Sequence, residues 1–499
     1  MTYQPGRSKA CITCLRRRKG CDKQKPTCER CLKSGFKCEG YDRPLVFRPA
    51  KQQLSTTKSR SLAPLALAQA RGERSILLND SLSHTAYQAR VIGLFWSLYL
   101  PNGKALPEQL ASISVGGWIE AMRESELRNS IVGKTLLSLA LRLVGRRDEV
   151  NWMNEQSRRL YGEALHGVCR TIALRQPQGE ETMLLLPAIR SLSLIEAIES
   201  TKTEHKAQNW QTHNLGEYDL FQMNPPSFYA TGRAHQLFLD ARLSLIMTLL
   251  IKRKKAFFAE AEWKTVPWLL NKKSPKDHLI DILCDIPSLY EQLDAFAQVK
   301  ASPLMNKASP LMNKIKKQGL ISTCRDLEAR LTQWQTEFIY FFDTDQEELN
   351  NPCSTTCDPE ILPAAHVRSI YWITGILIYT EWYDLLHDKY INIDKIGNSN
   401  ATTEATRAYK LSTLYCRNIL DSLTLFLHPA MGMYRLSFTS FQLASVQRFL
   451  RLFEGYAGNA GLEQERRLFD NYLAQEECKY ERQLLASLEK NRSVVGGGV

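Results

Sequence analysis

The sequence lacks the features that define several large classes of protein. It has no HExxH, GxSxG, Walker A or GxGxxG motif, so nothing in it indicates a known hydrolase, NTPase or dinucleotide-binding enzyme. No apolar run reaches the ~18 residues of a membrane-spanning helix, and the longest candidate, 370–380, is expected to be a buried helix. The start MTYQPGRSKA has no apolar stretch typical of secretory signals. We therefore expect a reducing compartment, no membrane partner and no enzymatic activity.

Alternating strand patterns are also scarce, whereas apolar residues recur at helical spacing. Such stripes occupy residues 87–98 before Pro101, 161–172, and 411–427 before Pro429. They predict a large all-α domain over residues 81–490, followed by a frayed tail at 491–499. Within this domain the heptapeptide ASPLMNK occurs twice, over 301–314, and its prolines predict a loop.

A heptad repeat is missing from the segment where a dimerising coiled coil could be expected. Residues 46–80 are rich in Ser, Thr, Gln and Ala, which predicts a flexible linker. The leucines of this segment keep no a/d register, and Pro64 interrupts it. We therefore expect either a monomer or a homodimer formed through the helical domain.

Cysteine, by contrast, is concentrated at the N-terminus. Six of the thirteen cysteines form two matching triplets, Cys11-x2-Cys14-x6-Cys21 and Cys28-x2-Cys31-x6-Cys38. Thiolates suit zinc, and four of them complete a structural tetrahedron. Six could fill one site with two to spare, or serve two ions that share two thiolates. The repeat favours two ions, and its symmetry points to Cys11 and Cys28 as the shared ligands.

Three disulfides are the alternative use of these six cysteines. The other seven cysteines are scattered, as in proteins of reducing compartments, which disfavours disulfides. A domain of residues 1–45 is too small to fold on apolar burial alone, so the metal would supply its folding energy.

Positive charge is concentrated in the same region. Residues 1–50 carry thirteen Lys and Arg against four Asp and Glu, which is +9 of the net +13 of the chain. A cluster of basic residues in one small domain is typical of proteins that bind the phosphates of nucleic acids, and it predicts double-stranded DNA as a partner. The run Arg16-Arg17-Arg18-Lys19 could double as a nuclear localisation signal.

The segment ACITCLRRRKGCDKQKPTCERCLKSGFKCEGY resembles the DNA-binding domain of fungal binuclear zinc-cluster (Zn2Cys6) transcription factors. The likeness covers the six cysteines, the basic run after the second one, and Pro26. It implies a small metal-stapled domain with two short helices and two zinc ions. It also implies that Cys11 and Cys28 bridge the two ions.

The resemblance further implies how DNA would be read. The first helix would end around Arg17 and Arg18 and enter the major groove over a CGG-like triplet, with these two residues touching bases. Arginine can contact guanine in bidentate fashion, although relatives usually carry lysine at the chief position. Phosphate contacts are expected from Arg16, Lys19, Lys23 and Lys25.

A second, weaker resemblance links the helical region to the fungal-specific regulatory domain that follows many zinc clusters. It is carried by Trp210-x2-His213-x2-Gly216, Phe228-x3-Gly232, Arg242 and Trp263. It implies a regulatory or effector-sensing role. His213 could contact an effector, but a structural role is favoured.

The sequence therefore predicts a nuclear, sequence-specific DNA-binding transcription factor, which regulates target genes together with the transcription machinery. Genes of a metabolic or biosynthetic pathway are one candidate set of targets. The alternatives are an enzyme that carries a zinc-cluster accessory domain, and a metal or redox sensor that uses the cysteines reversibly.

Overall fold

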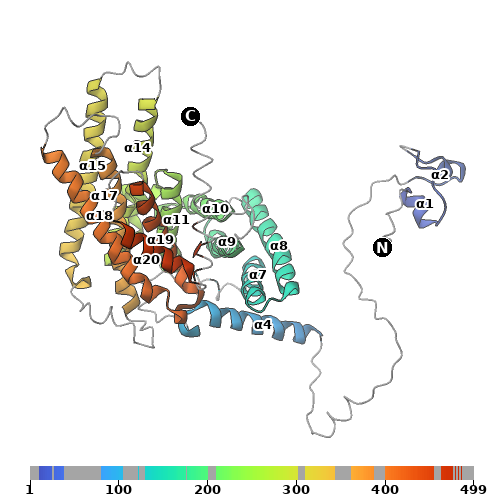
Figure 1. Ribbon diagram of the computed structural model, residues 1–499. Coiled ribbons are helices and arrows are strands. Elements are labelled where there is room, and N and C mark those ends of the chain that lie inside the picture. The colour runs from blue at the N-terminus through green and yellow to red at the C-terminus, as the bar shows by residue number, and fades with distance from the viewer. Residues whose placement is uncertain are drawn as a thin grey trace, which may run out of the picture. The chain divides into compact units, whose positions relative to one another are not determined.

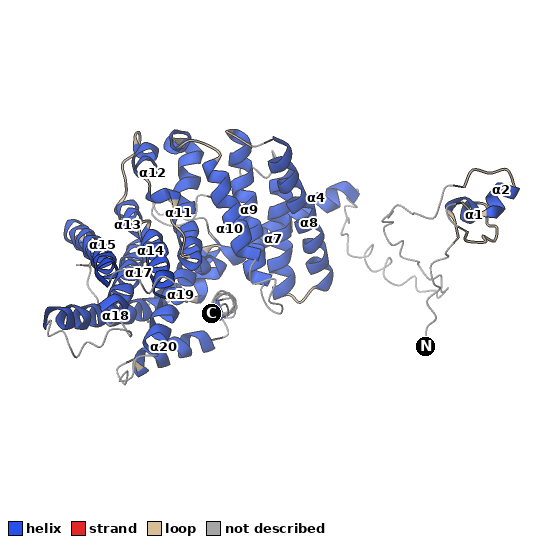
Figure 2. Cartoon of the chain, turned by 90° about the horizontal axis from the view of Figure 1, so that it is seen from above, coloured by secondary structure: helices blue, strands red, loops and turns tan. Residues whose placement is uncertain are grey.

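Helices account for all regular secondary structure in the residues that the structure describes (Figure 2). This computed structural model describes residues 10–24, 27–38, 80–104, 118, 122, 130–175, 177–199, 209–301, 310–342, 361–386, 399–454, 462–475, 478, 481–482 and 485. No strand occurs within these ranges, so the predicted all-α class of the large domain is confirmed. The chain separates into two compact units, Met1–Leu77 and Leu78–Val499.

The first unit contains two short helices, α1 (Ile12–Arg16) and α2 (Glu29–Lys33). Each starts next to the first cysteine of a triplet, as the repeat predicts. The first helix ends slightly earlier than expected. Arg18 adopts a left-handed backbone conformation with φ of 51°, which an α-helix does not accommodate.

The described part of the second unit consists of helices joined by loops and turns (Figure 1). Its described helices are α4 (Asp80–Tyr99), η1 (Pro101–Gly103), α7 (Ser130–Arg147), α8 (Asn151–Arg175), α9 (Glu180–Glu199), α10 (Asn209–Gln222), η3 (Pro226–Ala230), α11 (Gly232–Lys252), η4 (Phe257–Ala259), α12 (Ala261–Thr265), η5 (Val266–Trp268), α13 (Pro275–Leu283), α14 (Ile286–Ala301), α15 (Pro310–Glu337), η6 (Ile339–Phe341), α17 (Ile361–Leu386), α18 (Ser399–Phe426), η8 (Pro429–Arg435), α19 (Leu436–Glu454) and α20 (Glu463–Ala474).

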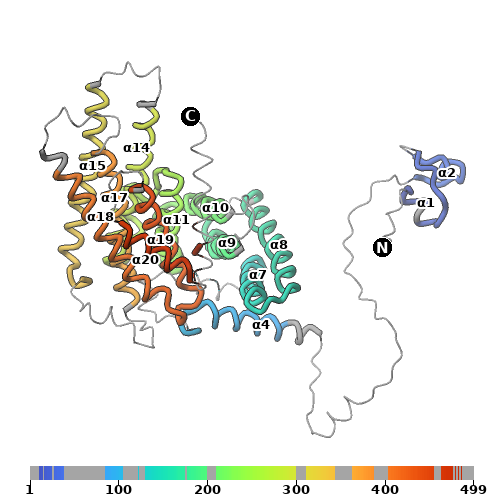
Figure 3. Tube along the Cα trace, viewed as in Figure 1, coloured from blue at the N-terminus to red at the C-terminus, as the bar shows by residue number. Residues whose placement is uncertain are grey.

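These helices pack in two groups. In the first, α7 contacts α4, α8 and α9, and α9 contacts α10 (Figure 3). In the second, α17 lies against α13, α15, α18 and α19 and is buried along most of its length. Gly375 permits the close approach of α17 to α18, because even a methyl group there would overlap the Tyr415 ring. The expected buried helix at 370–380 is part of α17.

The stretch that resembles a regulatory domain is a packing centre. Trp263 stacks near Tyr229 and Phe238, with ring centroids 5.7 and 5.9 Å away. Arg242 is fully buried on α11, pairs with Asp281 and places its guanidinium 4.6 Å from the Trp268 ring centroid. A buried charge persists only when it is paired in this way, so the ion pair ties α11 to α13.

Two further findings concern the helical region. The expected loop at the ASPLMNK repeat is wrong for its second copy, because α15 begins at Pro310. Proline is tolerated in the first helical turn, where its missing N–H has no intrahelical partner. Among the described helices α11 is long and apolar enough to span a membrane, but 67% of its apolar window is buried inside the unit. Such burial is typical of a core helix.

Several predicted segments lie outside the described residues. These are most of the linker 46–80, the first ASPLMNK copy after Ala301, and the tail 491–499.

The buried His366 of α17 makes the stability of the fold sensitive to acid. Its side chain packs edge-on against Phe438, and Nδ1 has no hydrogen-bond partner within the described residues. Burial, reinforced by the positive charge of Lys276, lowers the pKa of His366 to about 3. An unfolded chain binds this proton near pH 6.5.

We therefore expect stability to fall as the pH drops from about 6.5 towards 3, because only the unfolded state then binds the proton. The slope contributed by His366 should be about 1.4 kcal/mol per pH unit. Urea unfolding followed by circular dichroism between pH 7 and 5 measures it. In the His366→Phe variant, the free energy of unfolding should depend less steeply on pH. The same pH dependence in both proteins would contradict the assignment of the effect to His366.

Candidate metal centre and nucleic-acid interface

The six N-terminal cysteines lie together in the first unit. Their Sγ atoms form two sets of four, and within each set all atoms lie within 4.8 Å of one another. One set is Cys11, Cys14, Cys21 and Cys28, and the other is Cys11, Cys28, Cys31 and Cys38. Cys11 and Cys28 belong to both sets, as the symmetry of the sequence repeat predicts.

The spacing of the sulfur atoms suits zinc. The Sγ atom of Cys11 lies 3.5 Å from that of Cys28 and 3.7 Å from that of Cys31, and the Cys14 and Cys28 sulfurs are 3.6 Å apart. A zinc tetrahedron with Zn–S bonds of ~2.3 Å has edges of ~3.8 Å. The donor set and its dimensions therefore fit two zinc ions that share a pair of thiolates.

Backbone N–H groups at the two helix starts donate hydrogen bonds to the Sγ atoms of Cys11 and Cys28, which favours the negatively charged thiolate form. The Cys11 Sγ accepts a hydrogen bond from the backbone N–H of Cys14 at 3.3 Å, and the Cys28 Sγ accepts one from that of Cys31 at 3.4 Å. Each sulfur thus sits at the start of a helix, where N–H groups favour negative charge. Burial nevertheless raises the pKa of Cys11 to about 12 and also raises that of Cys28. A metal cation stabilises the thiolate form against this cost, with release of protons.

The predicted DNA-contacting residues follow directly from this framework. Arg16 is the last residue of α1, and its neighbours Arg18 and Lys19 are exposed. Lys23 is exposed in the loop after Cys21. The remaining predicted contact, Lys25, lies outside the described residues.

Arg17 differs from its neighbours, because its guanidinium carbon lies only 3.6 Å from the centroid of the Phe36 ring. Phe36 itself is 49% exposed. This stacked arrangement covers one face of the guanidinium with an aromatic ring, as in cation–π pairs. Sequence reasoning missed Phe36, although an aromatic residue between glycine and cysteine in a basic segment was a usable signal.

Two polar side chains fix the loops around the cluster. Asp22 accepts hydrogen bonds from the backbone N–H groups of Gln24 at 3.1 Å and Arg30 at 2.8 Å, which ties the loop after Cys21 to α2. Thr13 donates its hydroxyl to the carbonyl of Lys37 at 3.2 Å. These bonds hold α1, α2 and the intervening loop in one small framework.

Comparison with known proteins agrees with this geometry. Residues 9–46 match the family model of the fungal Zn(2)-Cys(6) binuclear cluster domain. A stretch of 49 residues is 51% identical to the aspercryptin biosynthesis cluster-specific transcription regulator atnN of Emericella nidulans. That stretch covers 10% of this chain and 8% of the relative. No solved structure matches the chain significantly.

The class defined by this site is a two-ion, thiolate-bridged cluster domain. Residues 9–46 carry a fungal Zn(2)-Cys(6) binuclear cluster domain, whose six cysteines bind two zinc ions as cofactors.

The sharing of ligands predicts unequal effects of cysteine substitutions. Cys28→Ser should lose both zinc ions, because Cys28 belongs to both sets, whereas Cys38→Ser should retain one ion. Zinc content per chain, measured by elemental analysis after desalting, distinguishes the two outcomes. Equal zinc loss in both variants would argue against shared ligands.

Proposed function

We propose that this chain is a nuclear regulator of transcription that binds double-stranded DNA in a sequence-specific manner through its zinc cluster. The observation that carries the proposal is the adjacency of a two-ion cysteine framework and the basic run Arg16–Lys19 in one small unit. Cys11 and Cys28 would bridge the ions, and the other four cysteines would each bind one ion. The metals would thereby fix where the end of α1 presents its cations.

Arg18 is the best candidate for reading a base. It is exposed, and its left-handed conformation turns the chain sharply just after the last helical residue. A free guanidinium can donate two parallel hydrogen bonds to O6 and N7 of guanine, which suits a CGG-like half-site.

Arg17 would contribute through the edge of its guanidinium. Stacking on Phe36 occupies a face of the group, but its N–H donors point outward in the guanidinium plane and could contact a base or a phosphate. Arg16, Lys19, Lys23 and Lys25 would bind phosphates, which adds affinity without sequence preference.

We assign the regulatory part of this function to the helical unit. The domain division proposed from the sequence is 1–45 for DNA binding, 46–80 as linker, 81–490 for regulation and 491–499 as tail. Regulation would include contacts with the transcription machinery and, where a dimer forms, self-association through the helical unit. The relative is named as a regulator specific to a biosynthesis cluster, which supports metabolic or biosynthetic genes as targets.

Arg18→Ala should weaken binding to a CGG-containing duplex by about 1–3 kcal/mol and relax the preference at the contacted position. Fluorescence anisotropy with the cognate duplex and with single-base variants measures both effects. Lys23→Ala is the matched control, since a lost phosphate contact should weaken all duplexes alike and reduce the salt slope by about 1. If the Arg18→Ala variant distinguishes the cognate duplex from its single-base variants as well as the unmodified protein does, Arg18 is excluded as the residue that reads the base.

Phe36→Leu should weaken DNA binding by about two- to fivefold, because an exposed cation–π pair is worth about 0.5–1 kcal/mol. The substitution keeps an apolar side chain but removes the ring that holds Arg17. Leu32, exposed at 67% on α2, provides the control, and Leu32→Ala should leave affinity unchanged. An unchanged affinity of Phe36→Leu at constant zinc content would show that the stacked pair does not prepare Arg17 for DNA.

A further inference from the structure

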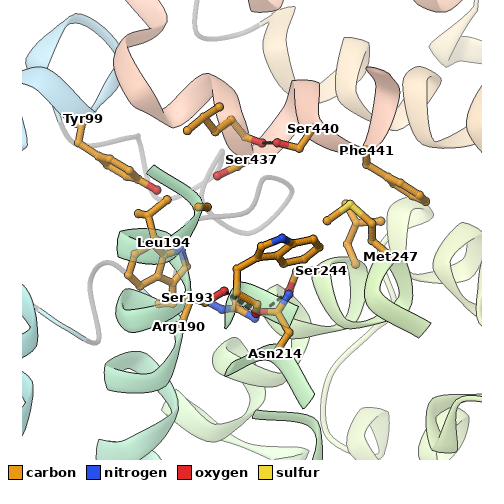
Figure 4. A pocket seen from close by; sticks show the side chains of 15 residues that line it. Tyr99, Arg190, Ser193, Leu194, Asn214, Ser244, Met247, Ser437, Ser440 and Phe441 are labelled. Carbon is orange, nitrogen blue, oxygen red and sulfur yellow. Dashed lines mark hydrogen bonds between the residues drawn. The ribbon is translucent and has the colours of Figure 1, made fainter. Parts of the chain in front are cut away.

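A cavity of about 170 Å³, partly open to solvent, lies in the helical unit between α19 on one side and α9, α10 and α11 on the other (Figure 4). Its walls are mostly apolar. Trp210, Leu243, Met247 and Phe441 contribute to them, and Trp210 is only 3% exposed. A dry apolar cavity of about 150 Å³ is large enough to bind benzene. The dimensions therefore suit a ligand of one or two fused rings.

The charge in the cavity wall is already neutralised. Arg190 donates from Nη2 to the Oε1 of Glu217 at 2.9 Å and to the Ser244 hydroxyl at 3.1 Å. The Glu217 side chain is 3% exposed, so this ion pair is largely shielded from water. An anionic ligand would have to compete with Glu217 for Arg190. A neutral ligand meets no such competition.

Four serines line the cavity. Ser437 hydrogen-bonds the Tyr99 side chain, and the other three donate their protons to oxygen atoms of the protein. Ser193 donates its hydroxyl to the Oδ1 of Asn214 at 2.8 Å, Ser244 donates to the carbonyl of Ala241 at 3.0 Å, and Ser440 donates to the carbonyl of Leu436 at 2.6 Å.

A serine hydroxyl has one proton and two acceptor lone pairs. All three protons are used within the protein, so what these side chains can offer a ligand is an acceptor. Figure 4 shows Ser193 and Ser244 on one side of the cavity and Ser440 on the other. A ligand that lies between them would be recognised by its hydrogen-bond donors.

We propose that this cavity is a binding site for a small, neutral, ring-containing molecule that carries a hydroxyl or N–H donor. The apolar walls supply affinity, and the lone pairs of Ser193, Ser244 and Ser440 select the donor group. This site lies wholly within the helical unit, and its occupation does not depend on DNA recognition by the zinc cluster.

The test uses the full-length protein and 2-naphthol as the probe, with 2-methoxynaphthalene as the analogue that lacks the donor. Calorimetric titration should give saturable binding of 2-naphthol, about five- to tenfold tighter than that of the ether, as expected for one net hydrogen bond. Binding should also raise the thermal midpoint. The titration contains no DNA, so absence of probe binding would not contradict the proposed DNA-binding function. Loss of DNA binding would likewise not contradict the proposed cavity site.

Two kinds of variant locate the site. Ala197, half-buried on α9, lines the cavity, and Ala197→Phe should fill it and abolish binding. Ala329→Phe, at an exposed position of α15, is the matched control and should bind as the unmodified protein does. The triple variant Ser193→Ala/Ser244→Ala/Ser440→Ala should retain binding but lose the preference for 2-naphthol over its ether.

If the Ala197→Phe variant binds 2-naphthol as well as the unmodified protein does, the probe does not bind in this cavity. If the folded unmodified protein does not bind 2-naphthol, the proposed site is wrong. Equal affinities for 2-naphthol and its ether would overturn the donor preference. If Ala197→Phe does not fold, the serine triple variant decides, because a retained preference for 2-naphthol without these three hydroxyls would place the bound probe elsewhere.

Discussion

The approach of two sulfur atoms, Cys11 Sγ and Cys28 Sγ at 3.5 Å, is the constraint on which the N-terminal unit depends. Each of these cysteines lies at the start of a five-residue helix, far too short to be stable alone in water. In the proposed cluster, two zinc ions that share this pair would connect both helix starts to a single centre. The two helices would then have a fixed geometry without an apolar core, because metal–sulfur bonds would set the orientation of α1 and α2.

The basic run Arg16–Lys19 closely follows Cys14 in the chain, so its position depends on how the cysteines are held together. Helix α1 ends at Arg16, and the left-handed backbone at Arg18 redirects the chain towards the third cysteine. Three successive arginines thus acquire different environments: the last helical position, a stacked pair with Phe36, and an exposed turn. Identical side chains with equal charge can then serve different roles, because affinity for phosphates needs only charge, whereas base reading needs a fixed direction.

Much of this was predictable from the sequence, since ligand type and spacing are chemically restrictive. The two sets with shared Cys11 and Cys28 follow from the repeat alone, and the helical stripes before Pro101 and Pro429 correspond to α4 and α18. The contact between Arg17 and Phe36 was not predictable, because it depends on the path of the chain around the metals. The helix start at Pro310 was missed because proline breaks a helix interior but suits a first turn.

The cavity of the helical unit was beyond sequence reasoning for a related reason. Its serines come from α9, α11 and α19, and each is unremarkable in its own segment. Their significance lies in where their protons go, which only packing decides: Ser244 and Ser440 donate to carbonyls of their own helices, and Ser193 donates to Asn214. In the proposed site, the lone pairs of these serines would favour a ligand that carries a hydrogen-bond donor. The motif residue Trp210 lines this cavity, whereas His213 bonds Tyr161 at 2.9 Å. Trp210, and not His213, is therefore the motif residue that a ligand in the proposed site would touch.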